Sequence, residues 1–325
     1  MSAYLLRRLL YAVPILLGVN LLTFLLFFMV NSPDDMARIQ LGAKYATPEA
    51  IERWKAGRGY DKPMFMNTQR EGVACLTDTL FVSKSLSMFA FDFGHADDGH
   101  DIAHEIRDRM GPSLAIALPS FLLSLAATIT FALLLVFFRA TAIDFWGVAI
   151  CVMLMSISSM FYIIGGQWLV AKLWALVPIS GYAGGLDAAR FLILPVLISV
   201  VGGLGAGTRW YRTLFLEEIS RDYVRTARAK GLSELAVLFR HVLKNALIPI
   251  LTGVVVVIPS LFMGSLLVES FFAVPGLGSY TIEAIQAQDF AVVRAMVFIG
   301  SLLYIVGLVL TDISYTLVDP RVRLG

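Results

Sequence analysis

The sequence is poor in charged residues. They make up only 15% of its 325 residues, whereas 58% are hydrophobic and the mean hydropathy is +0.77. A soluble chain of this size carries about 25% charged residues, because polar groups must cover its surface. The shortage excludes an ordinary water-soluble domain, and a net charge of only +2 gives no reason to expect a nucleic-acid partner. We therefore expect membrane lipid to surround much of the chain.

Cysteines and catalytic motifs are scarce too. Cys75 lies in a polar stretch and Cys151 in an apolar one, so we expect two unpaired thiols rather than a disulfide framework. No G-x-x-x-x-G-K-[ST] phosphate loop occurs, and therefore no ATP-binding motif is evident. The motifs G-x-S-x-G and H-E-x-x-H are also absent, which argues against an intramembrane enzyme.

Long apolar runs dominate what is present. A helix needs about 20 apolar residues to cross a hydrocarbon core of about 30 Å. Lipid offers the backbone no hydrogen-bond partners, and these runs lack the two-residue alternation of barrel strands. We therefore predict an all-α membrane protein with about six transmembrane helices, at residues 9–30, 113–138, 145–171, 191–208, 246–268 and 295–311.

Basic residues set the expected orientation. Arg7 and Arg8 precede the first run, which is longer than a signal-peptide core and lacks a small-residue cleavage site, so we expect it to remain uncleaved. By the positive-inside rule the N-terminus is then cytoplasmic. The loop 139–144, the segment 216–246 and the C-terminal tail 319–325 follow on the same side, and residues 31–112 lie outside.

Three regions follow from this topology. Residues 1–30 hold the N-terminal tail and first span, 31–112 form a small helical extracytoplasmic segment, and 113–325 form the membrane core. In the outer segment, Thr47-Pro48-Glu49 predicts a helix start and Gly57–Gly59 a stop. A second helix is predicted at 101–110.

Histidines gather in the outer segment between His95 and Glu105. His100 and His104, four residues apart, could share a divalent metal on one helix face. The stretch is acidic and has no hydrophobic shell to orient ligands. We therefore favour a solvated polar turn and predict no metal site.

The inner segment 216–246 has a defined helical pattern. Arg221, Arg225 and Arg228 recur at i, i+4 and i+7, which predicts one basic helix face. Gly231 can end that helix in the left-handed conformation, and Ser233 can cap the next. The second helix has an apolar stripe opposite a polar face, the stripe being Leu235, Leu238, Phe239, Val242 and Leu243.

Such a segment has two interpretations. A basic loop can bind anionic lipid headgroups, but that function needs charge and no particular order. A helix–Gly–helix pattern instead predicts an element held on one side and contacted on the other. The run Tyr-Val-Arg-Thr-Ala-Arg-Ala-Lys-Gly at 223–231, followed by Arg-His-Val-Leu-Lys-Asn-Ala-Leu-Ile-Pro at 240–249, closely resembles the coupling loop of ABC-importer permeases in the dipeptide/oligopeptide/nickel family.

The resemblance covers nearly the whole chain. Its further landmarks are Tyr4–Leu10, Gly59–Pro63, Phe91–Gly94, Pro275–Gly278 and Asp319–Arg321. The runs at 264–269 and 312–321 resemble the oligopeptide and microcin-uptake subgroup. The resemblance implies a type I ABC-importer permease fold in a bacterial inner membrane. It also implies a second homologous permease subunit, two ATPase subunits that carry ATP and Mg²⁺, and an extracytoplasmic solute-binding protein. This subunit itself would hold no cofactor.

The resemblance also assigns roles. Residues that would couple this chain to the ATPase are Tyr223, Arg225, Thr226, Arg228, Lys230, Gly231, Glu234 and Arg240. Candidates for the solute pathway are Ser156, Ser159, Met160, Gln167 and Glu269. The family implies peptides as solute, although nickel, sugars and other small solutes occur on the same scaffold.

Some assignments stay open. Glu269 and Asp312 lie near span ends, where hydrogen bonding at helix termini is favoured over a role in the solute path. Glycines at 202, 203, 205 and 207 favour close helix packing over a flexible point. Relatives often carry a proline near 156–161; its absence here predicts that a kink is lost. A secondary transporter or channel remains the alternative function, but it would require broken helices or inverted halves that the sequence does not reveal.

Overall fold

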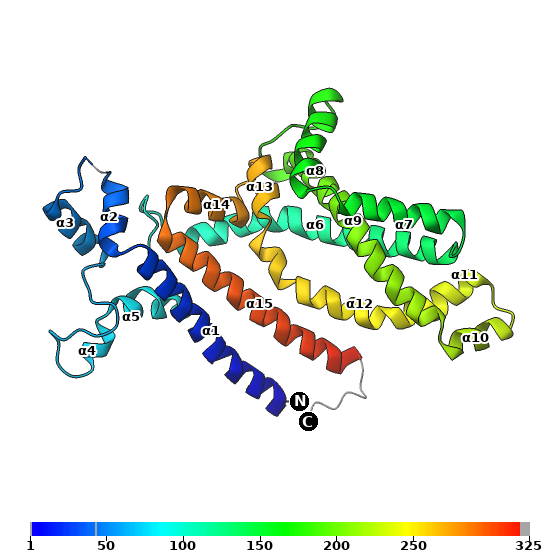
Figure 1. Cartoon of the computed structure of the whole chain (residues 1–325), viewed down its shortest axis with the longest axis horizontal. Coiled ribbons are helices and arrows are strands. Elements are labelled where there is room, and N and C mark those ends of the chain that lie inside the picture. Colours follow the sequence, from blue (N-terminus) through cyan, green and yellow to red (C-terminus); the bar gives the residue numbers. More distant parts are fainter. Residues whose placement is uncertain (1, 43, 319–325) are drawn as a thin grey trace. The chain divides into compact units, whose positions relative to one another are not determined.

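The computed structural model describes residues 2–42 and 44–318, and every regular element in this part of the chain is a helix (Figure 1). Among these residues five helices are long and apolar enough to cross a membrane, and a bent helix pair would make a sixth. The all-α prediction is confirmed. The predicted inner tail, with Arg321 and Arg323, and the landmark Asp319–Arg321 lie outside the described residues.

The chain divides into two compact units. One combines Met1–Asp108 with Glu283–Ile305, and the other combines Arg109–Ile282 with Val306–Gly325. Three helices have bounds that reach beyond one unit: α6 (Ile102–Phe137), α14 (Leu277–Ala287) and α15 (Phe290–Val318).

The first unit pairs long helices with a cap of short ones. Its other elements are α1 (Ser2–Val30), α2 (Pro33–Leu41), α3 (Pro48–Arg58), α4 (Ala74–Thr77), α5 (Leu80–Lys84) and η1 (Leu86–Ala90). The predicted start of α3 is confirmed, because the Thr47 hydroxyl accepts a hydrogen bond from the Ala50 amide and Gly59 ends the helix with φ +67°. The helix predicted at 101–110 is confirmed, but its predicted end is wrong. Those residues open α6, which continues through Gly111 and Pro112 without a break.

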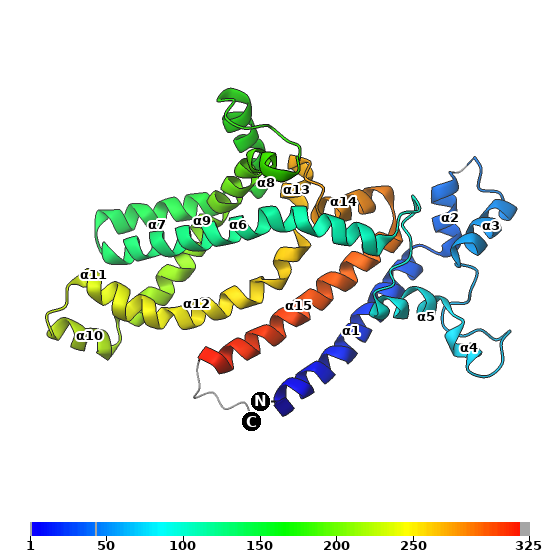
Figure 2. The ribbon, with the colours of Figure 1, turned by 180° about the vertical axis from the view of Figure 1, so that it is seen from behind.

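Aromatic side chains form the core of this unit. Phe24 and Phe28 of α1 pack with Tyr60 and Leu80, and the Trp54 ring stacks on Tyr60 at 5.5 Å. The α1 helix and the start of α15 run side by side (Figures 1 and 2). Contacts of Phe27 with Phe290 and of Phe28 with Arg294 tie these two helices together.

The second unit contains the remaining helices. These are α7 (Ala142–Met155), α8 (Ser159–Gly166), η2 (Gln167–Leu173), η3 (Gly185–Asp187), α9 (Ala188–Ile219), α10 (Asp222–Ala229), α11 (Glu234–Val237), η4 (Leu238–Leu243), α12 (Lys244–Val257), η5 (Pro259–Met263) and α13 (Leu266–Phe272).

Glycines let α9 approach its neighbours closely. A Cβ atom at Gly205 would lie 2.5 Å from the Cys151 carbonyl oxygen of α7, and one at Gly207 would lie 2.6 Å from Thr128 of α6. Neither position has room for a side chain. The packing role predicted for these glycines is confirmed, and Cys151 is an unpaired buried thiol, as expected.

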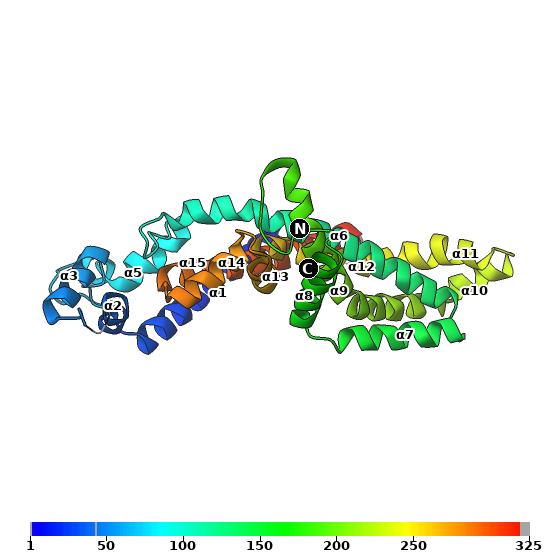
Figure 3. The same ribbon diagram turned by 90° about the horizontal axis from the view of Figure 1, so that it is seen from above.

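The third predicted span is broken. The α7 helix and the α8–η2 pair meet at an angle of 91° (Figure 3). The expectation that a missing proline removes the kink is therefore wrong. The Ser156 hydroxyl donates to the Val152 carbonyl at 2.9 Å, Ser158 is extended, and the Tyr162 hydroxyl donates to the Leu154 carbonyl at 2.7 Å. The Tyr162 side chain thus gives the Leu154 carbonyl a partner from beyond the bend.

Candidate functional site

The segment between α9 and α12 is a helical hairpin at the ends of both helices (Figure 2). Its first helix, α10, ends where Gly231 adopts φ +78° and its amide donates to the Arg228 carbonyl at 2.9 Å. The Ser233 hydroxyl then caps α11 by accepting from the Ala236 amide. Both local predictions are confirmed. Arg221, however, precedes α10 in an extended conformation, so it does not share a helix face with Arg225 and Arg228.

One side of the hairpin is buried. Val224 and Ala227 of α10 are enclosed by a cluster that includes Phe215 of α9, Val237 of α11 and Val242 of η4. Side chains of α6 complete the cluster. Burying a valine fully stabilises a fold by about 1.5–3 kcal/mol, so the hairpin is held firmly to the long helices of its unit.

The apolar stripe of the second helix is only partly buried. Leu238 and Val242 are in the core, but Leu235 and Phe239 are each 55% exposed. Only part of the predicted apolar stripe is therefore buried. Residues 238–243 form a π-helical turn, which adds a residue per turn and shifts side chains relative to an α-helical pattern.

The other side of the hairpin is exposed and polar. Seven of the eight predicted coupling residues are exposed and Arg228 is half-buried; the exposed ones are Tyr223, Arg225, Thr226, Lys230, Gly231, Glu234 and Arg240. We call these eight residues together the hairpin face. Leu235 and Phe239, whose side chains are also exposed, fall within the same stretch of sequence.

Ion pairs shape the hairpin face. Arg228 of α10 grips Glu234 of α11 with two hydrogen bonds of 2.7 and 3.1 Å, so it ties the two helices together across Gly231. Arg225 is freer, because its side chain is 79% exposed and lies 3.7 Å from the exposed Asp222 carboxylate. The Tyr223 hydroxyl donates to Glu218. Burial, with this bond, raises the pKa of Tyr223, which remains a neutral donor.

Sequence reasoning missed a second ion pair in this unit. The Arg212 guanidinium of α9 donates to both carboxylate oxygens of Asp144 in α7, at 2.9 and 2.8 Å. Asp144 also accepts from the Ala140 amide and is buried. The pair links the loop 139–144 to α9. An acid in the first turn of an otherwise apolar helix was the available signal.

The predicted solute-path residues do not converge on one site. Ser156, Ser159 and Met160 are exposed around the bend. Gln167 donates its amide to the carbonyls of Ile179 and Phe271, at 3.2 and 3.0 Å, so its donor atoms serve the fold.

Glu269 is enclosed by backbone. Its side chain is fully buried and its carboxylate accepts from the amides of Ser265, Gly278 and Ser279, at 3.0, 2.7 and 3.1 Å. Burial raises the pKa of Glu269, and these donors oppose the rise. Gly264 and Gly276 leave space for the carboxylate, since a side chain at either would collide with it. The arrangement matches the helix-end role that the sequence favoured.

A polar cavity lies between helices of the second unit, and Glu269 is the one predicted solute-path residue among those that line it. It has a volume of about 350 Å³. Serines provide most of its polar lining, namely Ser113, Ser120, Ser124, Ser199, Ser260 and Ser265. Three of them lie on α6 at helical spacing, and that stripe in an apolar run was the signal available to sequence reasoning.

The histidines at 100 and 104 each contact a different aspartate. His100 is 3.0 Å from Asp98 and His104 is 3.3 Å from Asp108, and both imidazoles are exposed. No group of three or more candidate metal ligands occurs within the described ranges.

The long apolar helices, with an exposed hairpin between two of them, are those of a multi-pass membrane protein. The chain belongs to the family of binding-protein-dependent transport system inner membrane components, whose model matches residues 109–324. The model of the family's N-terminal region matches residues 1–116. This protein is accordingly a permease subunit of an ABC importer in the inner membrane.

Relatives align over the whole chain. A candidate peptide transport system permease protein of Brucella abortus (strain 2308) is 33% identical over 329 residues, covering 99% of both chains. The oligopeptide transport system permease protein AppB of Bacillus subtilis (strain 168) is 30% identical over 340 residues, which are 99% of this chain and 100% of AppB. The dipeptide transport system permease protein DppB of Escherichia coli (strain K12) is 27% identical over 350 residues, 99% of both.

Proposed function

We propose that the hairpin face docks onto a cytoplasmic ATPase and transmits its motion to α9 and α12. The observation that carries the proposal is the asymmetry of α10, which is buried through Val224 and Ala227 and exposed through Arg225 and Thr226. A hairpin fixed to two membrane helices moves them when a partner moves it. ATP and Mg²⁺ would be bound by two ATPase subunits alone. The hairpin and both chain termini would then be cytoplasmic.

The solute is proposed to be a peptide. The relatives named above are peptide, oligopeptide and dipeptide permeases, and they align with the chain end to end. A second homologous permease would complete the pathway, and an extracytoplasmic binding protein would deliver the solute. We assign the serine-lined cavity to this half of the pathway, because hydroxyl groups can exchange hydrogen bonds with a passing peptide backbone.

One observation favours a second candidate function. The 91° break after α7 resembles the discontinuous helices of secondary transporters. Such proteins also carry two related halves, which this sequence lacks. ATP-driven import is therefore the better-supported function.

Arg225 offers a direct test of docking. Replacing it with glutamate (Arg225→Glu) is expected to lower co-purification of the ATPase subunits at least about tenfold, because a charge reversal opposes a complementary surface. The fold should be unaffected, since Arg225 is largely exposed and, among the described residues, its ion pair is with the exposed Asp222. The measurement is the ratio of ATPase to permease after affinity purification from membranes.

The matched control is Arg53→Glu, which reverses an exposed arginine on α3 in the outer segment. It should leave the ratio at the wild-type value. An Arg225→Glu permease that retains its ATPase as well as the control does would contradict the docking proposal.

A further inference from the structure

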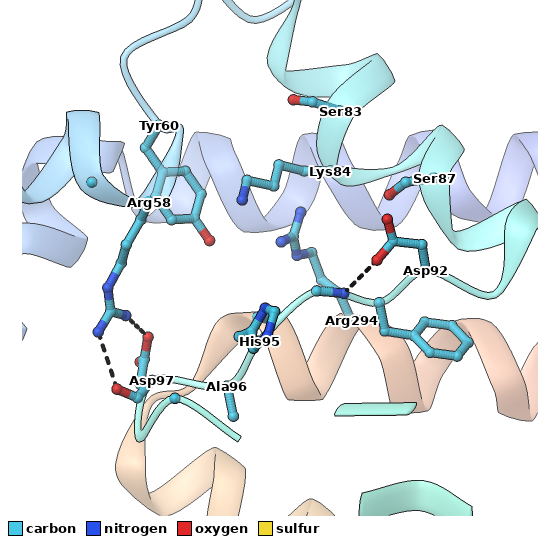
Figure 4. Close-up of a pocket in the computed structure, with 15 residues that line it drawn as sticks. Arg58, Tyr60, Ser83, Lys84, Ser87, Asp92, His95, Ala96, Asp97 and Arg294 are labelled. Atoms are coloured by element: carbon cyan, nitrogen blue, oxygen red, sulfur yellow. Dashed lines mark hydrogen bonds and ion pairs between the residues drawn. The ribbon is translucent and has the colours of Figure 1, made fainter. Parts of the chain in front are cut away.

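A cavity of about 560 Å³ lies in the unit formed by Met1–Asp108 and Glu283–Ile305 (Figure 4). Its lysine and arginine side chains come from three different elements, Arg58 from α3, Lys84 from α5 and Arg294 from α15, and His95 also lines it. The volume falls within the range of about 300–1,000 Å³ that is typical of small-ligand pockets. The transport mechanism proposed above does not use this cavity.

Arg294 is the most buried of the three cations. Its side chain is only 3% exposed, its Nε donates to the Phe290 carbonyl at 3.3 Å, and its guanidinium lies 5.2 Å from the centre of the Phe28 ring. The Nη1 atom has no hydrogen-bond partner. A buried guanidinium with an unused donor is costly, because both its charge and its N–H groups have lost water. The close-up in Figure 4 shows it directed into the cavity.

Lys84 adds a second cation that no ion pair neutralises within the described residues. Its ammonium lies 5.0 Å from the centre of the Tyr60 ring, and within residues 2–42 and 44–318 no carboxylate is at ion-pairing distance from it. Burial lowers the pKa of Lys84, and the positive charge of Arg294 lowers it further. Each cation therefore makes the other less favourable while the space between them holds no anion.

The acids that line the cavity form no ion pair with Lys84 or Arg294 within the described residues, although the charge of Asp92 partly offsets that of Lys84. Asp97 accepts from Arg58 and Gln40, and its own amide donates to Asp289. The Asp92 carboxylate is exposed and accepts from the Gly94 amide at 3.1 Å. Arg58 is thus neutralised by an ion pair, whereas Lys84 and Arg294 are not.

We propose that this cavity binds a small oxyanion, a carboxylate or phosphate group, between Lys84 and Arg294. A guanidinium presents parallel donors that match two oxygens of such a group, and an ammonium adds a point charge. The group can belong to a free solute. It can also belong to a lipid headgroup, because Arg294 lies in the first turns of the apolar helix α15. The proposal is independent of ATPase docking and of the solute carried.

The test uses the full chain purified in a maltoside detergent, which contains no phosphate. Isothermal titration calorimetry with inorganic phosphate and with acetate should show saturable binding of at least one anion by the wild-type chain. Lys84→Gln should weaken that binding at least about tenfold, since hydrogen bonds to charged groups are among the strongest. Lys84→Arg keeps the charge and should bind within a few-fold of wild type.

Controls separate the cavity from general basicity and from lipid. Arg53→Gln removes an exposed charge on α3 outside the cavity and should leave anion binding unchanged. Native mass spectrometry of chains purified from bilayers containing phosphatidylglycerol forms the lipid arm. Lipid retained by the wild type and lost by Lys84→Gln identifies a headgroup as the source. Free anion binding that depends on Lys84, without retained lipid, identifies a solute.

Two results would overturn the proposal. One is the lack of any anion binding and any retained lipid in the wild-type chain. The other is binding that Arg53→Gln weakens as much as Lys84→Gln does. ATP-driven uptake is not a readout in any arm, so failure here leaves the proposed function untouched.

Discussion

Gly231→Val is expected to reduce ATP-driven uptake at least about tenfold, without removing the permease from the membrane. Gly231 has φ +78°, a conformation that costs other L-residues about 1–2 kcal/mol and a β-branched residue more. An added Cβ would meet no atom within 4 Å, so the effect is conformational rather than a clash. A cost near 1.4 kcal/mol changes a population tenfold. The turn between α10 and α11 would then lose its conformation, and the hairpin would no longer transmit motion to α9 and α12. The measurement is peptide uptake normalised to permease content.

Two variants make this result specific. Asparagine tolerates the left-handed conformation, so Gly231→Asn should retain most of the uptake. Gly72→Val imposes comparable strain at φ +69° in the outer segment, also with open space around the new side chain, and should leave uptake near the wild-type rate. Wild-type uptake by Gly231→Val, at equal permease content, would contradict the lever assignment.

Glu269→Gln is expected to destabilise the second unit by about 3 kcal/mol. The carboxylate accepts from three backbone amides, and glutamine offers one acceptor oxygen while adding N–H donors to a site already filled with donors. The thermal unfolding midpoint of the purified permease should therefore fall clearly. Uptake should fall only in proportion to the folded protein that remains.

The control for this variant is Glu71→Gln, an exposed acid in the outer segment whose loss should not shift the midpoint. The experiment also separates the two roles considered for Glu269. Reduced uptake with an unchanged unfolding midpoint would place Glu269 in the solute path and contradict its role as a helix-end acceptor.

The hairpin could be predicted from sequence because its signals are local. Gly231 and Ser233 act on residues within one helical turn, and the apolar positions 224 and 227 repeat at helical spacing. The membrane-spanning helices could also be predicted, since the length of an apolar run is read directly from the sequence. The π-helical turn at 238–243 has no such local signature. The exposure of Leu235 and Phe239 was therefore missed.

Features that depend on distant residues could not be predicted. The bend after α7 is held by the Tyr162 hydroxyl, which bonds a carbonyl on the far side of the break, and no proline marks it. The amides around Glu269 come from residues up to ten positions away. The cavity joins Arg58, Lys84 and Arg294, whose proximity exists only in the folded chain. Helices can therefore be predicted from the sequence pattern, whereas the bend, the Glu269 site and the cavity depend on tertiary contacts.

The claim on which the account depends is that a separate ATPase drives this chain through the hairpin face. Peptide uptake into proteoliposomes tests it most directly, with the two permeases reconstituted either alone or together with the ATPase subunits and binding protein. We predict ATP-dependent uptake by the complete assembly and none by the permeases alone. Concentrative uptake by the permeases alone, with no ATPase present, would contradict the account.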